Sequence, residues 1–176
     1  MSPYLKGTQV YLRAIEEEDA NETYLSWLNN QETTKGLVTG RFPSSMQSLK
    51  SYLRSVTQGE DSVMFAICLV ENDKHIGNIK LDQFDYFART AELGVLIGEK
   101  NHRGKGIGSE SCKLVLDFAF ANLNLRKVTL SVFSNNPIAI KTYERLGFQV
   151  EGRLKQHFFS DGQYHDKIYM SYFKQQ

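Results

Sequence analysis

A glycine-rich stretch, His102 to Gly108 (HRGKGIG), constrains this chain more than any other part of its sequence. It follows an apolar run typical of a strand, 93–97, and precedes a run with helical spacing, 109–123. Its three glycines have no Cβ, so the backbone can turn tightly and its N–H groups can converge. The first amides of a helix lack partners within the helix and lie at the positive end of its dipole, which favours a phosphate. We therefore predict a phosphate-binding loop, to which Arg103 and Lys105 add positive charge.

Two well-known phosphate loops do not fit this stretch. A Walker A loop has the pattern G-x-x-x-x-G-K-[ST], and no glycine of this chain is followed by Lys-Ser or Lys-Thr. A Rossmann G-x-G-x-x-G that starts at Gly104 or Gly106 would need a third glycine where the chain has Ser109 or Ser111. A tight strand-to-helix turn without a ligand remains the alternative interpretation, since glycine-rich turns are common.

Two motifs in the second half of the chain resemble those of one enzyme family. The pattern Arg103-x-x-Gly106-x-Gly108 resembles the R/Q-x-x-G-x-G/A motif of the GNAT acetyltransferases, whose loop amides hold the pyrophosphate of acetyl-CoA. The segment 136–148 (NPIAIKTYERLGF) resembles the second motif of that family, N-x-x-A-x-x-x-Y-x-x-x-G-F.

Two further segments resemble the branch of that family that includes ribosomal-protein N-terminal acetyltransferases and spermidine acetyltransferases. One is the opening 11–19 (YLRAIEEED), and the other is the tail, with Glu151-Gly152, Asp161-Gly162, Asp166 and Tyr169. Because four motifs occur in the right order over nearly the whole chain, the resemblance implies a single GNAT domain over residues 1–176. It also implies an α/β fold: a mixed central sheet of about six to seven strands, with splayed central strands, flanked by about four helices.

Hydrophobic periodicity and turn residues indicate a mixed sequence of strands and helices. We predict strands at 9–14, 63–70, 75–84, 91–97 and 127–133, and a hairpin of 148–159 and 163–173 closed by Asp161-Gly162. Before the strand at 63–70 we predict two helices, one capped by Asp19 with Glu22 in a capping box and one that starts at Ser44 or Ser45. Two more helices follow, one at 109–123 and one that is capped by Asn136 and starts at Pro137.

Composition excludes several classes of protein. A hydrophobic content of 41% with 23% charged residues is ordinary for a globular protein, and a net charge of +1 argues against a dedicated nucleic-acid binder. Cys68 and Cys112 lie in apolar patterns and read as reduced core residues. The four histidines have no metal-ligand spacing, and no signal peptide or membrane-length apolar run is present. We expect a cytoplasmic protein with no metal, nucleic-acid or membrane partner.

The resemblance assigns the donor, acetyl-CoA, to the middle of the chain. It implies that strands 91–97 and 127–133 separate where the pantetheine arm lies, and that backbone groups of Val95, Leu96 and Ile97 hold the arm and the thioester carbonyl. One backbone N–H would stabilise the tetrahedral oxyanion, a contribution of about 3 kcal/mol. The connection 98–102 is one residue longer than the common form and lacks its proline. The predicted donor-binding set is completed by Arg103, Gly104, Lys105, Gly106, Ile107, Gly108, Asn136 and Tyr143.

Tyr143 is the candidate general acid. Direct transfer expels a thiolate that needs a proton, and a phenol with a pKa of about 10 is protonated at neutral pH. Tyr143 follows Asn136 by seven residues, which places both on one face of a helix. Asn136 would both cap that helix and contact the CoA arm. The alternative is that Tyr143 is only a core aromatic.

The candidate general base is Glu92. It lies on the strand that enters the site, at a position where members of the family often carry a carboxylate. The alternative is that Glu92 is only a solvated charge at the edge of a strand. Weaker candidates are Asp82 and Asp85 for a cationic substrate, His157 and Tyr164 as pocket lining, and Ser134 as a proton relay.

The acceptor is predicted from residues 27–43, which in the family build one wall of its pocket. Lys35 and Arg41 would suit a phosphate-bearing substrate such as a nucleotide-linked amino sugar, although each taken singly reads as an exposed loop charge. A polyamine would need a cluster of acids in this wall, which we do not recognise there. We expect an amino-sugar-like primary amine rather than a protein N-terminus or a polyamine. A non-catalytic acyl-CoA-binding sensor is the alternative function, and a homodimer is a possible assembly.

Overall fold

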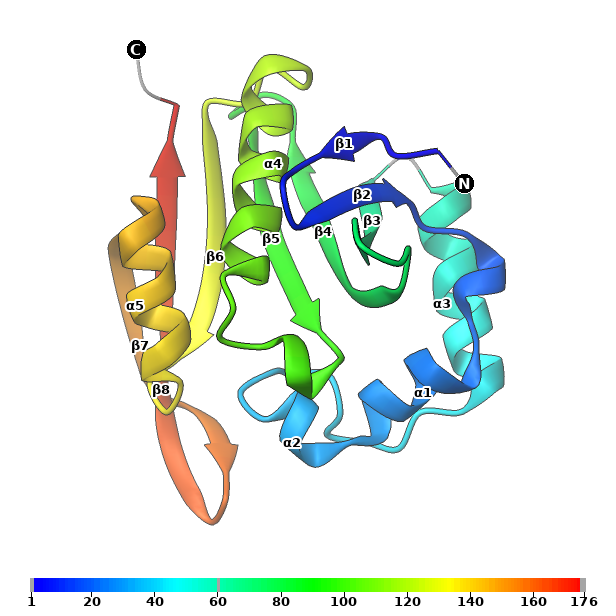
Figure 1. The fold of residues 1–176 in the computed structure, drawn as a ribbon. Coiled ribbons are helices and arrows are strands. Elements are labelled where there is room, and N and C mark those ends of the chain that lie inside the picture. The colour runs from blue at the N-terminus through cyan, green and yellow to red at the C-terminus, as the bar shows by residue number, and fades with distance from the viewer. Residues whose placement is uncertain (1, 60, 175–176) are drawn as a thin grey trace.

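Eight strands form one mixed sheet in the computed structural model, which describes residues 2–59 and 61–174. The strand order is β1-β2-β3-β4-β5-β6-β8-β7, and only the β5–β6 pair is parallel (Figure 1). The strands are β1 (Leu5–Lys6), β2 (Val10–Ala14), β3 (Ser62–Leu69), β4 (His75–Asp85), β5 (Thr90–Ile97), β6 (Lys127–Phe133), β7 (Gln149–Ser160) and β8 (Gln163–Phe173).

Five α-helices and two short 3-10 helices accompany the sheet in the described part of the chain. The helices are α1 (Glu22–Asn29), α2 (Gln31–Thr34), α3 (Met46–Gln58), α4 (Ile107–Ala121) and α5 (Pro137–Leu146), with 3-10 turns at Glu17–Asp19 and Lys100–His102. The sequence predicted six to seven strands and about four helices. The elements it missed, β1 and α2, have two and four residues, too few to show a hydrophobic period.

The two faces of the sheet carry separate hydrophobic cores, because side chains alternate along each strand. Val10 and Leu12 of β2 join the core that α4 and α5 cover, whereas Tyr11 between them joins the core under α1 and α3. Figure 1 shows α4 and α5 together in front of the sheet. Cys68 and Cys112 are buried and free, as predicted, one in each core.

The start of the first long helix differs from the prediction. Its cap is Asn21, whose side chain accepts a hydrogen bond from the Tyr24 amide at 3.0 Å. Asp19 lies instead in the preceding 3-10 turn, where its carboxylate binds the guanidinium of Arg13 at 2.7 Å. The predicted capping box of Asp19 and Glu22 is therefore wrong, because a buried arginine on β2 competes for the carboxylate. Elsewhere Ser45 caps α3 and Asn136 caps α5, as expected.

The sheet opens between its two central strands. β5 and β6 are paired only over their first three residues, by the pairs Thr90–Lys127, Ala91–Val128 and Glu92–Thr129. Beyond this point the β6-facing edge of β5 has no strand partner, while its other edge stays paired with β4 as far as Ile97. The predicted splay is confirmed, and it places unpaired backbone N–H and C=O groups in the middle of the molecule.

Candidate active site

The glycine loop ends as an uncapped helix N-terminus. Gly104 and Gly106 have φ of +73° and +84°, which glycine adopts without strain. Gly106 is the residue before α4, and no side chain caps this helix. A Cβ added at Gly104 would meet nothing within 4 Å, so the backbone conformation, not packing, requires glycine there. The first N–H groups of α4, from Ile107 onward, have no partner within the helix and no side-chain cap, so they can bind an anion.

The two cations of the loop have different roles in the structure. Arg103 donates from Nε to the Ile97 carbonyl at 3.0 Å and from a terminal nitrogen to the Gly98 carbonyl at 3.1 Å. Its guanidinium is thereby held against the end of β5. Lys105 is exposed and has no ion-pair partner within residues 2–59 and 61–174. Lys105 is therefore the side chain of this loop whose charge is free for a phosphate.

Asn136 and Tyr143 lie on the same side of the sheet as the loop. Asn136 Oδ1 accepts a hydrogen bond from the Ala139 amide at 3.1 Å, which confirms the predicted cap. Tyr143 is half-buried against the core under α4, with its ring edge-to-face on Phe148 at 5.8 Å. Burial raises the pKa of Tyr143, so the phenol keeps its proton at neutral pH. Its hydroxyl has no hydrogen-bond partner among the described residues, and it is free to donate.

Glu92 lies at the last paired position before the strands separate. Its carboxylate accepts from Ser131 Oγ of β6 at 3.3 Å and from Gln83 Nε2 of β4 at 3.0 Å. Glu92 is half-buried, and its contacts link three strands. Its side chain shares a face with Gly94 and Leu96, two and four residues along the strand.

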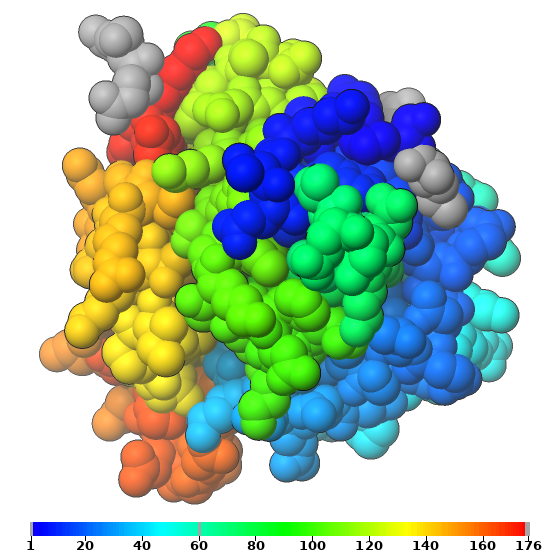
Figure 2. Space-filling view, viewed as in Figure 1, coloured from blue at the N-terminus to red at the C-terminus, as the bar shows by residue number. Residues whose placement is uncertain are grey.

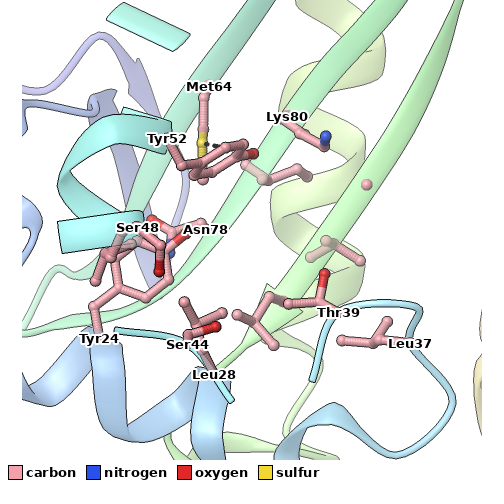
Figure 3. A pocket seen from close by; sticks show the side chains of 15 residues that line it. Tyr24, Leu28, Leu37, Thr39, Ser44, Ser48, Tyr52, Met64, Asn78 and Lys80 are labelled. Carbon is pink, nitrogen blue, oxygen red and sulfur yellow. Dashed lines mark hydrogen bonds between the residues drawn. The ribbon is translucent and has the colours of Figure 1, made fainter. Parts of the chain in front are cut away.

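A pocket of about 450 Å³ adjoins this face of β5 (Figure 3). Its walls come from α1, the loop before α3, α3 itself, and the strands β3, β4 and β5. The backbone segment 94–96 belongs both to the pocket and to the unpaired end of β5. The lining residues are Tyr24, Leu28, Leu37, Thr39, Ser44, Ser48, Leu49, Tyr52, Met64, Asn78, Ile79, Lys80, Gly94, Val95 and Leu96.

Lys35 and Arg41, the two cations predicted to bind the acceptor, do not line this pocket. Lys35 forms an ion pair with Asp161 at 3.1 Å, and the Arg41 guanidinium lies 4.7 Å from the centre of the Phe158 ring. Both partners belong to the β7–β8 hairpin, so the loop before α3 reaches across the opening in the sheet. Figure 2 shows its light-blue surface beside the orange tip of that hairpin. The argument from Lys35 and Arg41 for a phosphate-bearing acceptor therefore loses its structural basis.

The weaker sequence candidates also lie away from the pocket. His157 and Tyr164 are exposed on the hairpin, and Ser134 Oγ accepts a hydrogen bond from the Asp166 amide at 3.0 Å. Asp85 accepts from the Ala88 amide at 2.7 Å, which stabilises the β4–β5 turn.

Sequence reasoning missed the polar side chains that β4 and α3 bring to the pocket. Asn78 and Lys80 are two residues apart on β4, and that spacing alone could have placed them on one face. Lys80 is bound to Asp82. Burial by itself would lower the pKa of Lys80, but the hydrogen bonds and charges of Asp82 and Tyr52 together outweigh burial and raise the pKa. A second pocket, of about 480 Å³, continues beyond Lys80 and includes Asp61 and Asp82.

Comparison with known proteins identifies the family. A family model described as an acetyltransferase (GNAT) domain matches residues 9–149. The chain belongs to this family. As a GNAT N-acetyltransferase it uses acetyl-CoA as the acyl donor, which agrees with the open strand edge and the uncapped helix beside it. Among the described residues, no group of three or more His, Cys, Asp or Glu side chains is placed to hold a metal ion.

Several similar proteins are named spermidine acetyltransferases. The chain is 30% identical to spermidine N(1)-acetyltransferase of Vibrio cholerae over 91% of its length and 90% of that enzyme. The Escherichia coli enzyme of that name is 39% identical over 57% of this chain, and the match spans about half of that enzyme, 53%. A putative ribosomal N-acetyltransferase of Bacillus subtilis is 28% identical over 95% of this chain and 92% of the relative.

Solved structures agree with the fold. A crystal structure of the Vibrio cholerae spermidine N-acetyltransferase in complex with CoA and spermine superposes with a TM-score of 0.86 at 29% identity, covering 95% of this chain and 96% of that one. No helix in the described part of this chain combines the length and the apolar character needed to cross a bilayer.

Proposed function

We propose that this GNAT enzyme transfers acetyl from acetyl-CoA to a small primary amine that is bound in the pocket between α1, α3 and the sheet. One observation carries the proposal: the segment 94–96 is both the unpaired edge of β5 and a wall of the pocket. A thioester that pairs with this edge meets an amine in the pocket without a change of fold. Such placement of two reactants turns a bimolecular step into an effectively unimolecular one.

The donor is bound on the α4 side of the sheet in this proposal. The pyrophosphate contacts the first amides of α4, at Ile107 and Gly108, and the charge of Lys105. The pantetheine arm pairs with the backbone of Val95, Leu96 and Ile97 like an extra strand. Asn136 contacts the arm from the start of α5 through the amide nitrogen that capping leaves free.

In this proposal the acetyl group is transferred with help from residues on both sides of the opening between β5 and β6. The neutral amine attacks the thioester carbonyl carbon, and a backbone N–H of β5 stabilises the resulting oxyanion. The C–S bond then breaks, and the departing thiolate takes the phenolic proton of Tyr143. Glu92, on the pocket side, takes the proton that the amine loses, either directly or through water.

The pocket favours an acceptor that carries oxygen atoms, such as an amino sugar. Hydroxyl groups of Thr39, Ser44, Ser48 and Tyr52 line it, and among the described lining residues the one charged side chain is the cation Lys80. No carboxylate is among the described residues that line the pocket, so a polycation would find no counter-charge on these walls.

Polyamine acetylation is the second candidate function. It is supported by the relatives named spermidine acetyltransferases and by Asp61 and Asp82 in the adjoining pocket, which could take a distal ammonium group. Lys80, bound to Asp82 between the two pockets, opposes it.

The test is CoA release from acetyl-CoA with a panel of amines: hexosamines and nucleotide-linked amino sugars, polyamines, aminoglycosides and peptides with free N-termini. Turnover with a hydroxylated amine at a kcat/KM above that for spermidine supports the proposal. Faster turnover of spermidine supports the second candidate. Tight acetyl-CoA binding without turnover of any amine supports the alternative of a non-catalytic acyl-CoA sensor.

Association with a second copy is also proposed. The edge strand β7 is long and largely exposed, and it presents Val150 and Leu154 at 53% and 41% exposure. A dodecameric structure exists for the Vibrio cholerae relative. Light scattering during size-exclusion chromatography measures the mass: a multiple of 20.2 kDa supports association, and 20.2 kDa contradicts it.

A further inference from the structure

The floor of the acceptor pocket contains a buried polar group that the reaction described above does not use. Asn78 of β4 is 3% exposed and lines the pocket (Figure 3). Its amide nitrogen, Nδ2, has no hydrogen-bond partner among the described residues and almost no contact with solvent. An unpaired buried donor destabilises a fold, so one that a native protein retains needs an explanation.

The orientation of this amide is fixed by His75. The ring atom Nε2 lies 3.0 Å from the Gly77 carbonyl oxygen and 2.9 Å from the oxygen of the Asn78 amide. Because a carbonyl oxygen can only accept, Nε2 carries a hydrogen and donates it. The Asn78 atom that faces the same N–H must then be the oxygen. The amide nitrogen consequently points away from His75, whether or not the ring is doubly protonated.

Rigid neighbours hold His75 in this position. Its ring lies edge-to-face on Trp27 at 5.2 Å and on Tyr24 at 6.2 Å. Its Nδ1 lies 3.7 Å from the carboxylate of Asp19, which is itself bound to Arg13. The Asn78 amide therefore cannot rotate freely to satisfy its nitrogen elsewhere, and the unpaired donor is built into the fold.

From this geometry we infer that Asn78 determines acceptor specificity by donating a hydrogen bond from Nδ2 to an oxygen atom of the amine substrate. The inference rests on the proposed function, since it takes the pocket as the acceptor site. Because Asn78 is held by His75, a bound oxygen reaches the nitrogen when the side chains around the amide shift, an adjustment that is common on binding. The class of acceptor is thus an amine with a hydroxyl or other oxygen near the reacting nitrogen.

The same group discriminates against polyamines. A protonated polyamine offers N–H donors but no acceptor atom beyond its reacting nitrogen, so it leaves Nδ2 unpaired. Lys80, two residues further along the same strand face, is paired with Asp82 and so engages the carboxylate that could otherwise bind a polyamine. A site built to bond a substrate oxygen rejects an analogue that lacks it more strongly than a purely apolar pocket does.

The test compares acceptor binding in the presence of CoA, so that it does not depend on turnover. The probes are glucosamine, cyclohexylamine, which keeps the six-membered ring and the amine without hydroxyls, and spermidine. Binding is followed by calorimetry and by the fluorescence of Trp27, the only tryptophan of the chain, which contacts His75. Asn78→Asp keeps the oxygen that faces His75 and replaces the donor by a carboxylate. Asn72→Asp makes the same change of charge in the exposed turn that precedes β4 and serves as the control.

We expect the wild-type protein to bind glucosamine roughly tenfold or more tightly than cyclohexylamine. Asn78→Asp should lose that preference and gain affinity for spermidine, while Asn72→Asp should match the wild type. Equal binding of glucosamine and cyclohexylamine by the wild type overturns the inference, even if Asn78→Asp fails to fold. The inference is also overturned if the wild type does not bind glucosamine, or if Asn78→Asp and Asn72→Asp bind glucosamine with the same affinity. Normal glucosamine binding without CoA release from acetyl-CoA refutes the proposed function alone.

Discussion

The Nε atom of Arg103 donates to the main-chain carbonyl of Ile97 at 3.0 Å, and so the glycine loop is fastened to the strand that leads into it. Arg103 is the cation of the family motif, and its guanidinium is thus bound to backbone carbonyls. In this structure Arg103 sets the position of the loop, and Lys105 supplies its free charge. The difference matters because positioning and charge respond differently to salt.

Lys105→Ala should weaken CoA binding several-fold at low ionic strength, and the effect should shrink as salt screens the exposed charge. Arg103→Ala should weaken binding by an amount that changes little with salt, because it removes hydrogen bonds that hold the loop. Calorimetric titration with CoA at two salt concentrations measures both effects. A salt-independent loss in Lys105→Ala would contradict the assignment of its charge to the phosphate.

Gly106→Val should raise the Kd for CoA by about tenfold or more, because a residue with a Cβ is strained at φ of +84° and the side chain would crowd the pyrophosphate. Calorimetry against CoA measures the loss. Gly152→Val is the control, since Gly152 has an ordinary φ and a Cβ there meets nothing within 4 Å. Near-normal CoA affinity in a folded Gly106→Val protein would refute the phosphate site.

Tyr143→Phe should lower kcat by about 10²–10⁴-fold and leave CoA affinity unchanged, since it removes the proton donor and keeps the ring. Stopped-flow or steady-state measurement of CoA release gives kcat, and calorimetry gives the affinity. Tyr172→Phe is the matched control, because Tyr172 packs on the same Phe148 ring at 5.6 Å. Similar kcat values in the two variants would mean that Tyr143 is only a core aromatic.

Glu92→Gln should lower kcat/KM by about 10²-fold or more at neutral pH, because the amide cannot accept the proton of the amine. The loss should diminish as the pH rises, since a larger share of the acceptor amine is then already neutral. A pH series of initial rates measures this, with Glu144→Gln on the exposed face of α5 as control. An unchanged rate and pH profile would exclude Glu92 as the base.

Asp19→Asn should destabilise the fold by about 3–5 kcal/mol, because it leaves Arg13 buried without its counter-charge. Burial alone would raise the pKa of Asp19, but hydrogen bonds from Arg13 and from the Glu16 amide outweigh it and lower the pKa. The contribution of Asp19 to stability is therefore complete above its unfolded pKa of about 4 and is lost as the pH falls through the lower folded value. Urea unfolding of both proteins from pH 7 to pH 3 measures the difference, which should narrow in acid. A constant difference would contradict the ion pair as its source.

The sequence predicted correctly the elements that are long or that are bounded by clear turn and cap residues. The range of β6 is the predicted one, the Asp161-Gly162 turn closes the hairpin with φ of +51° and +76°, and Asn136 caps α5 because its side chain is an acceptor next to a proline. The start of α4 was placed two residues late, since Ile107 and Gly108 were taken as loop. Asp19 was misassigned because its partner, Arg13, contacts it only in the folded chain.

The sequence by itself determined the family, the glycine loop before a helix, and the position of Tyr143 in its motif, because these are set by neighbours along the chain. Tertiary structure decided which side chains face the acceptor. Lys35 and Arg41 turned to the hairpin, whereas Asn78 and Lys80 of β4 became pocket lining beside Tyr52 of α3. The physical reason is that a pocket wall is shared by elements far apart in sequence, and only strand register and helix packing bring their side chains together.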